Sequence, residues 1–243
     1  MRRKFTDIHH HILYGLDDGA ASPQKMYEML EKAAEDNIGR IVATPHVTPG
    51  VKRFDRDQFD RALRDARRYC DENGLDIELY EGCEILYTSQ TASFLLDGRI
   101  PTMADTDYVL VEFSPDVRFE RFKEAMDSLL GYGYLPIVAH VERYACLAQH
   151  PARAEKIKEE MDVCFQVNCS SIIGNKKSSM CSQRFVEKLL DWDLIDALGT
   201  DAHSPNMRTV HMREAWQRLK KEFGTAYANE LTDGHLLFNI PED

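Results

Sequence analysis

Three histidines stand together near the N-terminus, within the stretch FTDIHHHILYGLDDGA of residues 5–20. Side chains alternate in direction along an extended segment, so His9 and His11 point to the same side and His10 points to the other. We therefore leave His10 out of the candidate site. Neutral imidazole and carboxylate are normal ligands of zinc, manganese and iron. The stretch predicts half of a metal site, whose other ligands must come from elsewhere in the chain.

Further metal-binding side chains recur where the other apolar runs end. These runs finish in TPH, GCE, VEF, AHVER, QVN and GTDAH. Asp201 and His203 repeat the two-residue spacing of His9 and His11, which places a carboxylate and an imidazole on one side. A single histidine at a strand end is more often an ordinary polar residue, but their joint occurrence favours a multinuclear metal site. The candidate ligands at strand ends are His9, His11, His46, Glu84, Glu112, His140, Asp201 and His203. We expect His150, His211 and His235 on the surface or on helices.

The elements that must position these residues alternate along the chain. Short apolar runs predict strands near residues 5–9, 40–45, 76–84, 108–113, 134–140, 163–168 and 195–200. Amphipathic stretches between them predict helices at about 22–37, 55–73, 118–130, 151–160, 182–191 and 208–223. Ser22 and Pro23 suit the N-cap and the first position of the first helix.

The order of these elements predicts the class of fold. Strand-then-helix units in succession predict a parallel sheet. Seven units in about 240 residues favour a closed or nearly closed barrel of the TIM type over an open doubly wound sheet. No GxGxxG follows a strand, which further disfavours the open sheet. Since no low-complexity linker or repeat interrupts the chain, we expect one α/β domain over residues 1–243.

Composition limits the location and the partners that we expect. No apolar run approaches the ~20 residues that span a bilayer, and the basic start MRRK is not followed by the apolar segment of a secretory signal. These features predict a cytoplasmic protein with no membrane insertion. Acidic residues number 41 against 30 Lys plus Arg, a formal charge of −11, which argues against a general nucleic-acid binder.

The six cysteines do not indicate cysteine chemistry. No two of them form a CxxC pair, so a thiolate zinc ribbon is not expected. A cysteine nucleophile in a phosphate-binding loop would need an arginine six residues later, and none of the six cysteines has that spacing. Any hydrolytic chemistry should therefore depend on metal.

Taken together, these motifs make the chain resemble the PHP family (polymerase and histidinol phosphatase). Within it, the chain is similar to the bacterial capsule-type metal-dependent protein-tyrosine phosphatases. The resemblance runs almost end to end, through DIHHHILYGLDDGA, ATPH, GCEILYT, IPTMADTDYVLVEFS, PIVAHVERY, FQVN and GTDAHSPNMR. An HxH with a distant DxH is shared by many metallohydrolases, whereas DDGA, EFS and HVERY point to the tyrosine-phosphatase branch. The resemblance implies a distorted (β/α)7 TIM-like barrel, the PHP fold. It also implies three divalent metal ions, in the first place Mn²⁺, with iron or zinc as alternatives.

The resemblance also implies a role for each candidate residue. For the first metal it implies the ligands His9, His11 and Asp201, with Glu84 bridging to the second. For the second metal it adds Glu112 and His140, and for the third it implies Asp18, His46 and His203. Arg143 and Arg208 match family arginines near the phosphate site, where charge-assisted hydrogen bonds would hold phosphate oxygens. From the residues alone, the alternative for each arginine is a surface ion pair.

The function implied is hydrolysis of phosphotyrosine on proteins, with a tyrosine kinase of capsule or exopolysaccharide synthesis as the expected partner. One alternative is a histidinol-phosphate phosphatase with the same metals, and another is a non-catalytic metal-binding regulator of a kinase. A nuclease-like PHP domain fits poorly with one short acidic domain. A degenerate regulator should have lost ligands, and this chain keeps all nine.

Two segments depart from the family pattern. Residues 231–235 (LTDGH) replace an ENP-like turn, which we expect to affect only C-terminal packing. The loop after Asn168 (SSIIGNKKSSM) matches poorly, and we expect it at the substrate entrance. The role of residues 169–181 in substrate choice stays open at this point.

Overall fold

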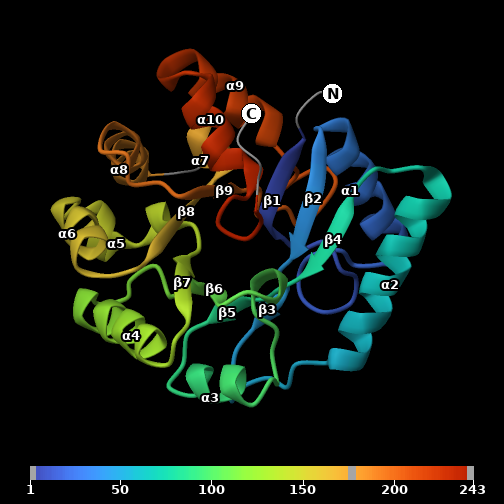
Figure 1. Ribbon diagram of the computed structural model, residues 1–243, viewed down its shortest axis with the longest axis horizontal. Helices are drawn as coiled ribbons and strands as arrows, with labels where there is room; N and C mark the ends of the chain where they lie inside the picture. The colour runs from blue at the N-terminus through green and yellow to red at the C-terminus, as the bar shows by residue number, and fades with distance from the viewer. Residues whose placement is uncertain (1–3, 175–178, 240–243) are drawn as a thin grey trace.

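The computed structural model describes residues 4–174 and 179–239, and its strands form curled, all-parallel sheets surrounded by helices (Figure 1). One sheet has the order β1-β2-β4 and the other the order β3-β5-β6-β7-β8-β9. Their strands are β1 (Phe5–His10), β2 (Ile38–Ala43), β3 (His46–Val47), β4 (Glu78–Glu81), β5 (Glu84–Leu86), β6 (Tyr108–Glu112), β7 (Leu135–Val138), β8 (Cys164–Asn168) and β9 (Ala197–Gly199). The predicted α/β class and parallel pairing are thus confirmed.

Two of the predicted strands are each split in two, which corrects the sequence analysis. The run 40–45 yields β2 and then β3, and the run 76–84 yields β4 and then β5. Pro45 stands at the first break, where its missing N–H suits the end of a ladder. Since β2 pairs with β4 and β3 with β5, both runs pass from one sheet to the other at their breaks. The second pairing sets His46 directly opposite Glu84.

The two sheets meet where the segment after β9 runs beside β1. His10 forms a parallel bridge with Ala202. The N–H of Asp201 donates to the carbonyl of His9 at 2.8 Å, and the N–H of His11 donates to the carbonyl of Ala202 at 3.0 Å. The buried carboxylate of Asp7 accepts the N–H of Thr200 at 2.9 Å. This seam joins the first and last strands, and therefore brings the two predicted HxH and DxH pairs together.

Helices pack around the outside of the strands on all sides of the view in Figure 1. The six predicted helices correspond to α1 (Pro23–Glu35), α2 (Arg56–Asn73), α4 (Phe119–Gly131), α6 (Ala152–Glu160), α8 (Met180–Asp191) and α9 (Met212–Phe223). Four others in the described residues were not predicted: α3 (Thr91–Leu96), α5 (Ala145–Ala148), α7 (Cys169–Ile172) and α10 (Thr225–Asp233). Ser22 caps α1 as expected, and its side chain accepts from the N–H of Lys25. Helix α9 begins four residues later than predicted, where the carboxylate of Asp36 accepts the N–H of Met212 at 2.7 Å.

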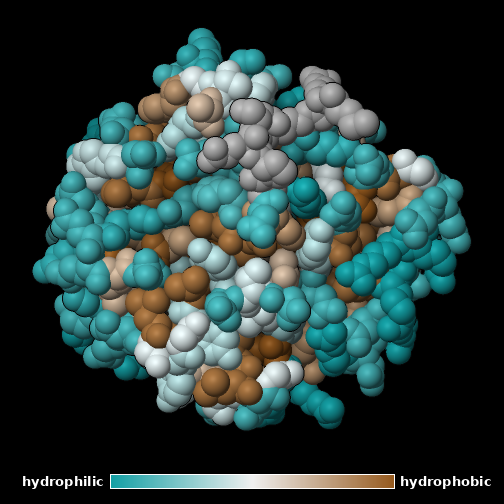
Figure 2. All heavy atoms as spheres, viewed as in Figure 1, coloured by the Kyte–Doolittle hydropathy of each residue, from teal (hydrophilic) through white to brown (hydrophobic). Residues whose placement is uncertain are grey.

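The apolar core has two parts. A large cluster lies between strands and helices, and a smaller one gathers side chains from several strands with Met103 and Leu237. Hydrophilic residues cover most of the face in Figure 2, most densely over α2. Within the described parts of the chain, every helix is too short or too polar to span a bilayer.

Candidate metal centre

All nine predicted ligands gather where the strands end. His9 belongs to β1 and His11 follows it, while His46, Glu84 and Glu112 lie on β3, β5 and β6. His140 follows β7, Asp201 and His203 follow β9, and Asp18 lies on the loop after β1. The ligand atoms of seven of them form three overlapping groups, each within 4.8 Å: His11, Asp18, His46 and His203; His9, His11 and Glu84; and His46, Glu84 and Glu112. The other two lie beside these groups, with Nε2 of His140 2.7 Å from Oε1 of Glu84 and Oδ1 of Asp201 3.6 Å from Nε2 of His9.

Glu84 belongs to two of these groups and is fully buried. Its Oε1 accepts a 2.7 Å hydrogen bond from Nε2 of His140. Its Oε2 has no hydrogen-bond partner, yet it lies 3.1–3.2 Å from nitrogens of three imidazoles, those of His9, His11 and His46. Burial raises the pKa of this carboxyl, but the surrounding imidazoles outweigh burial and hold it well below its usual value. Glu84 is therefore an ionised carboxylate with an oxygen free to bind a cation.

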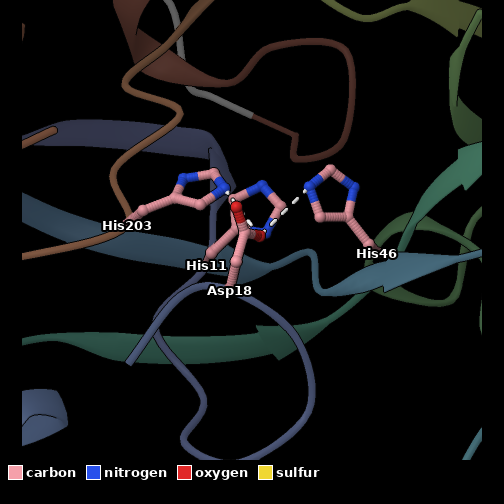
Figure 3. Close-up of side chains that lie close together, drawn as sticks. All are labelled: His11, Asp18, His46 and His203. Carbon is pink, nitrogen blue, oxygen red and sulfur yellow. Dashed lines mark ion pairs between the residues drawn. The ribbon is translucent and has the colours of Figure 1, made fainter. Parts of the chain in front are cut away.

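A second gathering of ligand atoms lies at the edge of the site, shown in Figure 3. Oδ1 of Asp18 lies 3.5 Å from Nε2 of His46 and 3.3 Å from Nε2 of His203. Nε2 of His203 is buried without a hydrogen-bond partner. Burial and the nearby His11 lower the pKa of His203 to about 4. The ring is thus neutral near pH 7 and presents a lone pair, as a metal ligand must.

His46 and His140 both approach the pair of glutamates. Nδ1 of His46 lies 3.0 Å from Oε1 of Glu112, and Nε2 of His140 lies 3.7 Å from Oε2 of Glu112. His46 thus belongs geometrically to two of the ligand groups, whereas the family resemblance assigned it to the third metal alone. Because these two groups share His46, cations bound to them would be close neighbours.

Asp17 is a site residue that the sequence analysis did not assign. Its Oδ2 accepts from Nδ1 of His11 at 2.7 Å and from the N–H of His46 at 2.9 Å. Burial lowers the pKa of His11, but the hydrogen bond to Asp17 and the nearby carboxylate of Glu84 outweigh burial and raise that pKa to about 10. A proton on Nδ1 faces Asp17, so Nε2 is directed at the ligand cluster. The family resemblance assigned Asp18 as a ligand, and the structure adds Asp17 as the residue that orients His11.

Gly19 explains why the DDG sequence can fold here. A Cβ at this position would collide with the backbone carbonyl of His11 and would lie 2.6 Å from its Cβ. The N–H of Gly19 donates to Oδ1 of Asp17 at 2.9 Å. Glycine therefore lets the Asp17–Asp18 loop lie against the first strand, where both carboxylates reach the histidines.

The two predicted phosphate-site arginines converge on one carboxylate. Nη2 of Arg143 donates to Oδ2 of Asp201 at 2.5 Å, and Nη2 of Arg208 donates to Oδ1 at 2.7 Å. The arginine side chains are 42% and 44% exposed, whereas that of Asp201 is 2% exposed. These contacts are thus ion pairs to a buried candidate ligand, and they differ from the ordinary surface pairs that the sequence left open.

A cavity of about 430 Å³ lies beside these arginines. Arg143, Arg208, Ser170, Ile173 and Met207 are among its lining residues. Ser170, Ile173 and Gly174 of the poorly matching loop therefore border the arginine side of the site. Residues 175–178 of that loop lie outside the described residues.

The other histidines lie apart from the ligand groups, as predicted. His10 is buried and neither of its ring nitrogens has a hydrogen-bond partner. His150 and His235 are exposed. His211 is the N-cap residue of α9 and lines the cavity beside Arg208.

Comparisons with known proteins agree with this geometry. Residues 5–235 match the family model described as "Capsular polysaccharide synthesis, CpsB/CapC". The tyrosine-protein phosphatase CpsB of Streptococcus pneumoniae is 27% identical over 230 residues, which are 93% of this chain and 93% of the relative. The tyrosine-protein phosphatase YwqE of Bacillus subtilis is 29% identical over 229 residues, 93% and 88% of the two chains.

A solved structure is also similar over nearly the whole chain. It comes from the work titled "Crystal structures of YwqE from Bacillus subtilis and CpsB from Streptococcus pneumoniae, unique metal-dependent tyrosine phosphatases". The TM-score is 0.84 at 28% identity, and the match covers 93% of this chain and 90% of the other. The family that the motifs predicted is therefore confirmed.

Proposed function

The chain belongs to the CpsB/CapC family of capsular polysaccharide synthesis, and on that premise we propose that it is a metal-dependent phosphatase that hydrolyses phosphotyrosine on proteins. One observation carries the proposal. The buried Glu84 faces imidazoles on the cation-binding side of the site, and Asp201 joins that side to Arg143 and Arg208. A phosphate ester needs both kinds of partner, cations for its oxygens and donors that hold it in place.

The metal set we propose is three divalent ions, in the first place Mn²⁺. The first would be held by His9, His11, Asp201 and Glu84, the second by Glu84, Glu112 and His140, and the third by Asp18, His46 and His203. The donor chemistry supports this set, because imidazole and carboxylate suit manganese, iron and zinc. The partnerless atoms Oε2 of Glu84 and Nε2 of His203 point to the same need for cations. When bound, such ions would neutralise phosphate charge and supply an activated water.

The chain's own residues then position the substrate. Arg143 and Arg208 would hold non-bridging phosphate oxygens, and they border both Asp201 and the cavity. The cavity would take the tyrosyl side of the phosphate ester, with Ile173 and Met207 offering apolar surface at its wall. A tyrosine phenolate, with a side-chain pKa of ~10, is a tolerable leaving group. No cysteine nucleophile or covalent phosphoenzyme is needed.

The broader assignment is as follows. We propose that residues 1–243 form a single PHP domain, in which β2 with β3 and β4 with β5 each occupy one position of a distorted (β/α)7 barrel. The proposed substrate protein is a cognate tyrosine kinase of capsule or exopolysaccharide synthesis in the cytoplasm. The family match and the relatives' names support a phosphotyrosine protein as the class of substrate.

A substrate panel tests the proposal. The Mn²⁺-loaded protein is assayed for phosphate release from phosphotyrosine peptides, phosphoserine peptides and histidinol phosphate. We expect phosphotyrosine peptides to give the highest kcat/KM. A preference for histidinol phosphate would replace the proposal with a small-molecule phosphatase. No turnover of any substrate by fully loaded protein would favour a metal-binding regulator.

A further inference from the structure

Strand β8 carries two buried amide side chains that no role assigned so far explains. Gln166 and Asn168 are 0% and 2% exposed, and they are two residues apart, so they lie on the same face of the strand. Buried amides without partners are costly, and these two are fully engaged with the metal centre. They connect candidate ligands that come from three different parts of the chain.

The hydrogen bonds form one continuous relay. Oε1 of Gln166 accepts the backbone N–H of His140 at 2.8 Å and contacts Nδ1 of His9 at 3.0 Å. Nε2 of Gln166 donates to Oδ1 of Asn168 at 2.9 Å. Nδ2 of Asn168 donates to Oδ2 of Asp201 at 2.8 Å.

The direction of this relay is fixed at both of its ends. A backbone N–H can only donate, so the oxygen of Gln166 must face His140 and its NH₂ group must face Asn168. The Asn168 oxygen must then face Gln166, which leaves its NH₂ group to donate to the Asp201 carboxylate. Since the Gln166 oxygen can only accept, His9 must carry a proton on Nδ1. Its Nε2 is thereby directed toward Glu84, which lies 3.2 Å away.

The relay also contacts two residues whose backbone conformation is unfavourable on its own. His140 has φ 34° and Asp201 has φ 53°, in the left-handed region that residues other than glycine rarely adopt. Such conformations persist where the surroundings impose them, often at functional sites. Gln166 bonds the N–H of His140, and Asn168 bonds the side chain of Asp201.

Gly199 on β9 gives the Gln166 side chain the space it needs. A Cβ on Gly199 would lie 2.6 Å from Cβ of His9 and 3.0 Å from Nε2 of Gln166. Glycine therefore allows β1, β8 and β9 to approach closely enough for the amide to reach His9.

We propose that Gln166 and Asn168 are positioning residues for the metal centre, through a relay of fixed direction that sets the His9 tautomer and orients Asp201. This inference rests on the proposed metal binding. Residues that orient metal ligands typically change metal affinity or activity by 10–100-fold when they are lost. We therefore expect Gln166→Met and Asn168→Ala to weaken Mn²⁺ binding by about 10–100-fold.

The experiment is a competition titration of chelator-treated protein with Mn²⁺ against a fluorescent chelator. Asn229→Ala is the matched control, because its amide oxygen accepts a 3.0 Å hydrogen bond from Nε1 of Trp216. That control should keep its Mn²⁺ affinity within about threefold, since its hydrogen bond goes to Trp216 on α9 and residues that share no partners act independently. Folded Gln166→Met and Asn168→Ala proteins that both bind Mn²⁺ like the wild type would overturn the relay.

A second measurement needs no variant and so does not depend on the folding of Gln166→Met. Nitrogen NMR of the Zn²⁺-loaded wild-type protein reports which ring nitrogen of His9 carries the proton. We expect the proton on Nδ1, and a proton on Nε2 would overturn the relay. A wild-type protein that binds neither Mn²⁺ nor Zn²⁺ would instead contradict the proposed function, and the relay's role in metal binding with it.

Discussion

Arg143 donates a 2.5 Å hydrogen bond to Asp201, and this pair joins the candidate phosphate site to the candidate metal site. The carboxylate is buried, while the guanidinium reaches the cavity. Arg208 holds the other carboxylate oxygen at 2.7 Å. A phosphate beside the metal ligands would therefore find both arginines within reach.

Replacing either arginine should impair catalysis even when excess Mn²⁺ keeps the metal sites filled. Charge-assisted hydrogen bonds contribute roughly 1.5–3 kcal/mol, so Arg143→Ala or Arg208→Ala should lower kcat/KM about ten- to a hundredfold, at ~1.4 kcal/mol per decade. Lysine should rescue only partly, because it supplies the charge without the planar fork. The measurement is steady-state kinetics on p-nitrophenyl phosphate, with metal counted in each sample.

Arg121→Ala is the control for this comparison. Arg121 forms an exposed pair with Glu124 at 3.0 Å, and such pairs contribute only ~0–1 kcal/mol. Its kcat/KM should change by less than about threefold. If Arg143→Ala and Arg208→Ala behaved like this control, the phosphate site would lie elsewhere, and residues 170–174 would be examined next.

Variants of the central ligands should lose metal while keeping their fold. Glu84→Ala and His140→Ala each remove an atom that faces several other candidate ligands. Glu84→Gln is the most conservative of these variants, since it keeps the shape of the side chain and removes its charge. We expect reduced metal per chain by elemental analysis, loss of most activity, and an unchanged circular dichroism spectrum. Fully loaded and fully active variants would remove these residues from the site.

Much of this site could be predicted from the chain because its ligands occupy strand ends. Parallel strands bring such ends together whatever their separation in sequence, so His9 and Asp201 could be placed together from their positions at predicted strand ends. The broken strands were not predicted, although Pro45 and Gly82 stand at the two breaks, because each run reads as one strand that ends near its candidate ligand. The sheet change at each break depends on pairing between distant strands.

The residues that orient the ligands were harder to identify. Gln166 and Asn168 appear in the sequence as polar residues within a short strand, and only the folded structure reveals their contacts with three candidate ligands. Asp17 could not be distinguished from Asp18 by residue type. For Arg143 and Arg208, the sequence left a surface pair open, because the burial of Asp201 depends on the seam between β1 and β9.

Thiol modification should leave catalysis almost unchanged. Burial raises the pKa of Cys70 to about 11 and that of Cys164 to about 12, so these thiols are poorly reactive near pH 7. Cys181 is exposed and should be the main site of labelling. After iodoacetamide treatment at pH 7.5, activity of the Mn²⁺-loaded protein should stay within about twofold, because thiolate supplies no part of the mechanism. Inactivation that tracks the labelling of one cysteine, at constant metal content, would contradict a thiol-independent mechanism.

The C-terminal departure at residues 231–235 should affect stability rather than catalysis. The hydrogen bond to Asp233 raises the pKa of His235 above its usual value, more than burial lowers it. The stabilisation that protonated His235 gives to the folded protein is complete below the unfolded pKa of ~6.5. It is lost as pH rises through the pKa of the folded state. Because the His235 ring is over a third exposed, solvent screening limits this stabilisation to less than ~1 kcal/mol.

His235→Asn should therefore destabilise the protein more at pH 6 than at pH 9. Urea unfolding at the two pH values measures the difference, and kcat/KM should be unchanged. A loss of stability that is the same at both pH values would show that the charge on His235 is not involved. A large loss of activity would mean that this segment does more than pack.

The most direct test of the central claim is a metal titration of activity. The protein is stripped with a chelator, its metal content is measured, and phosphate release from a phosphotyrosine peptide is followed as Mn²⁺ is added back. We expect no turnover in the stripped protein and recovery that follows the filling of the sites. Bound metal should also raise the free energy of unfolding, by ~2.7 kcal/mol at 100 times Kd for one site. Full phosphotyrosine hydrolysis by protein in which elemental analysis detects no metal would contradict the account.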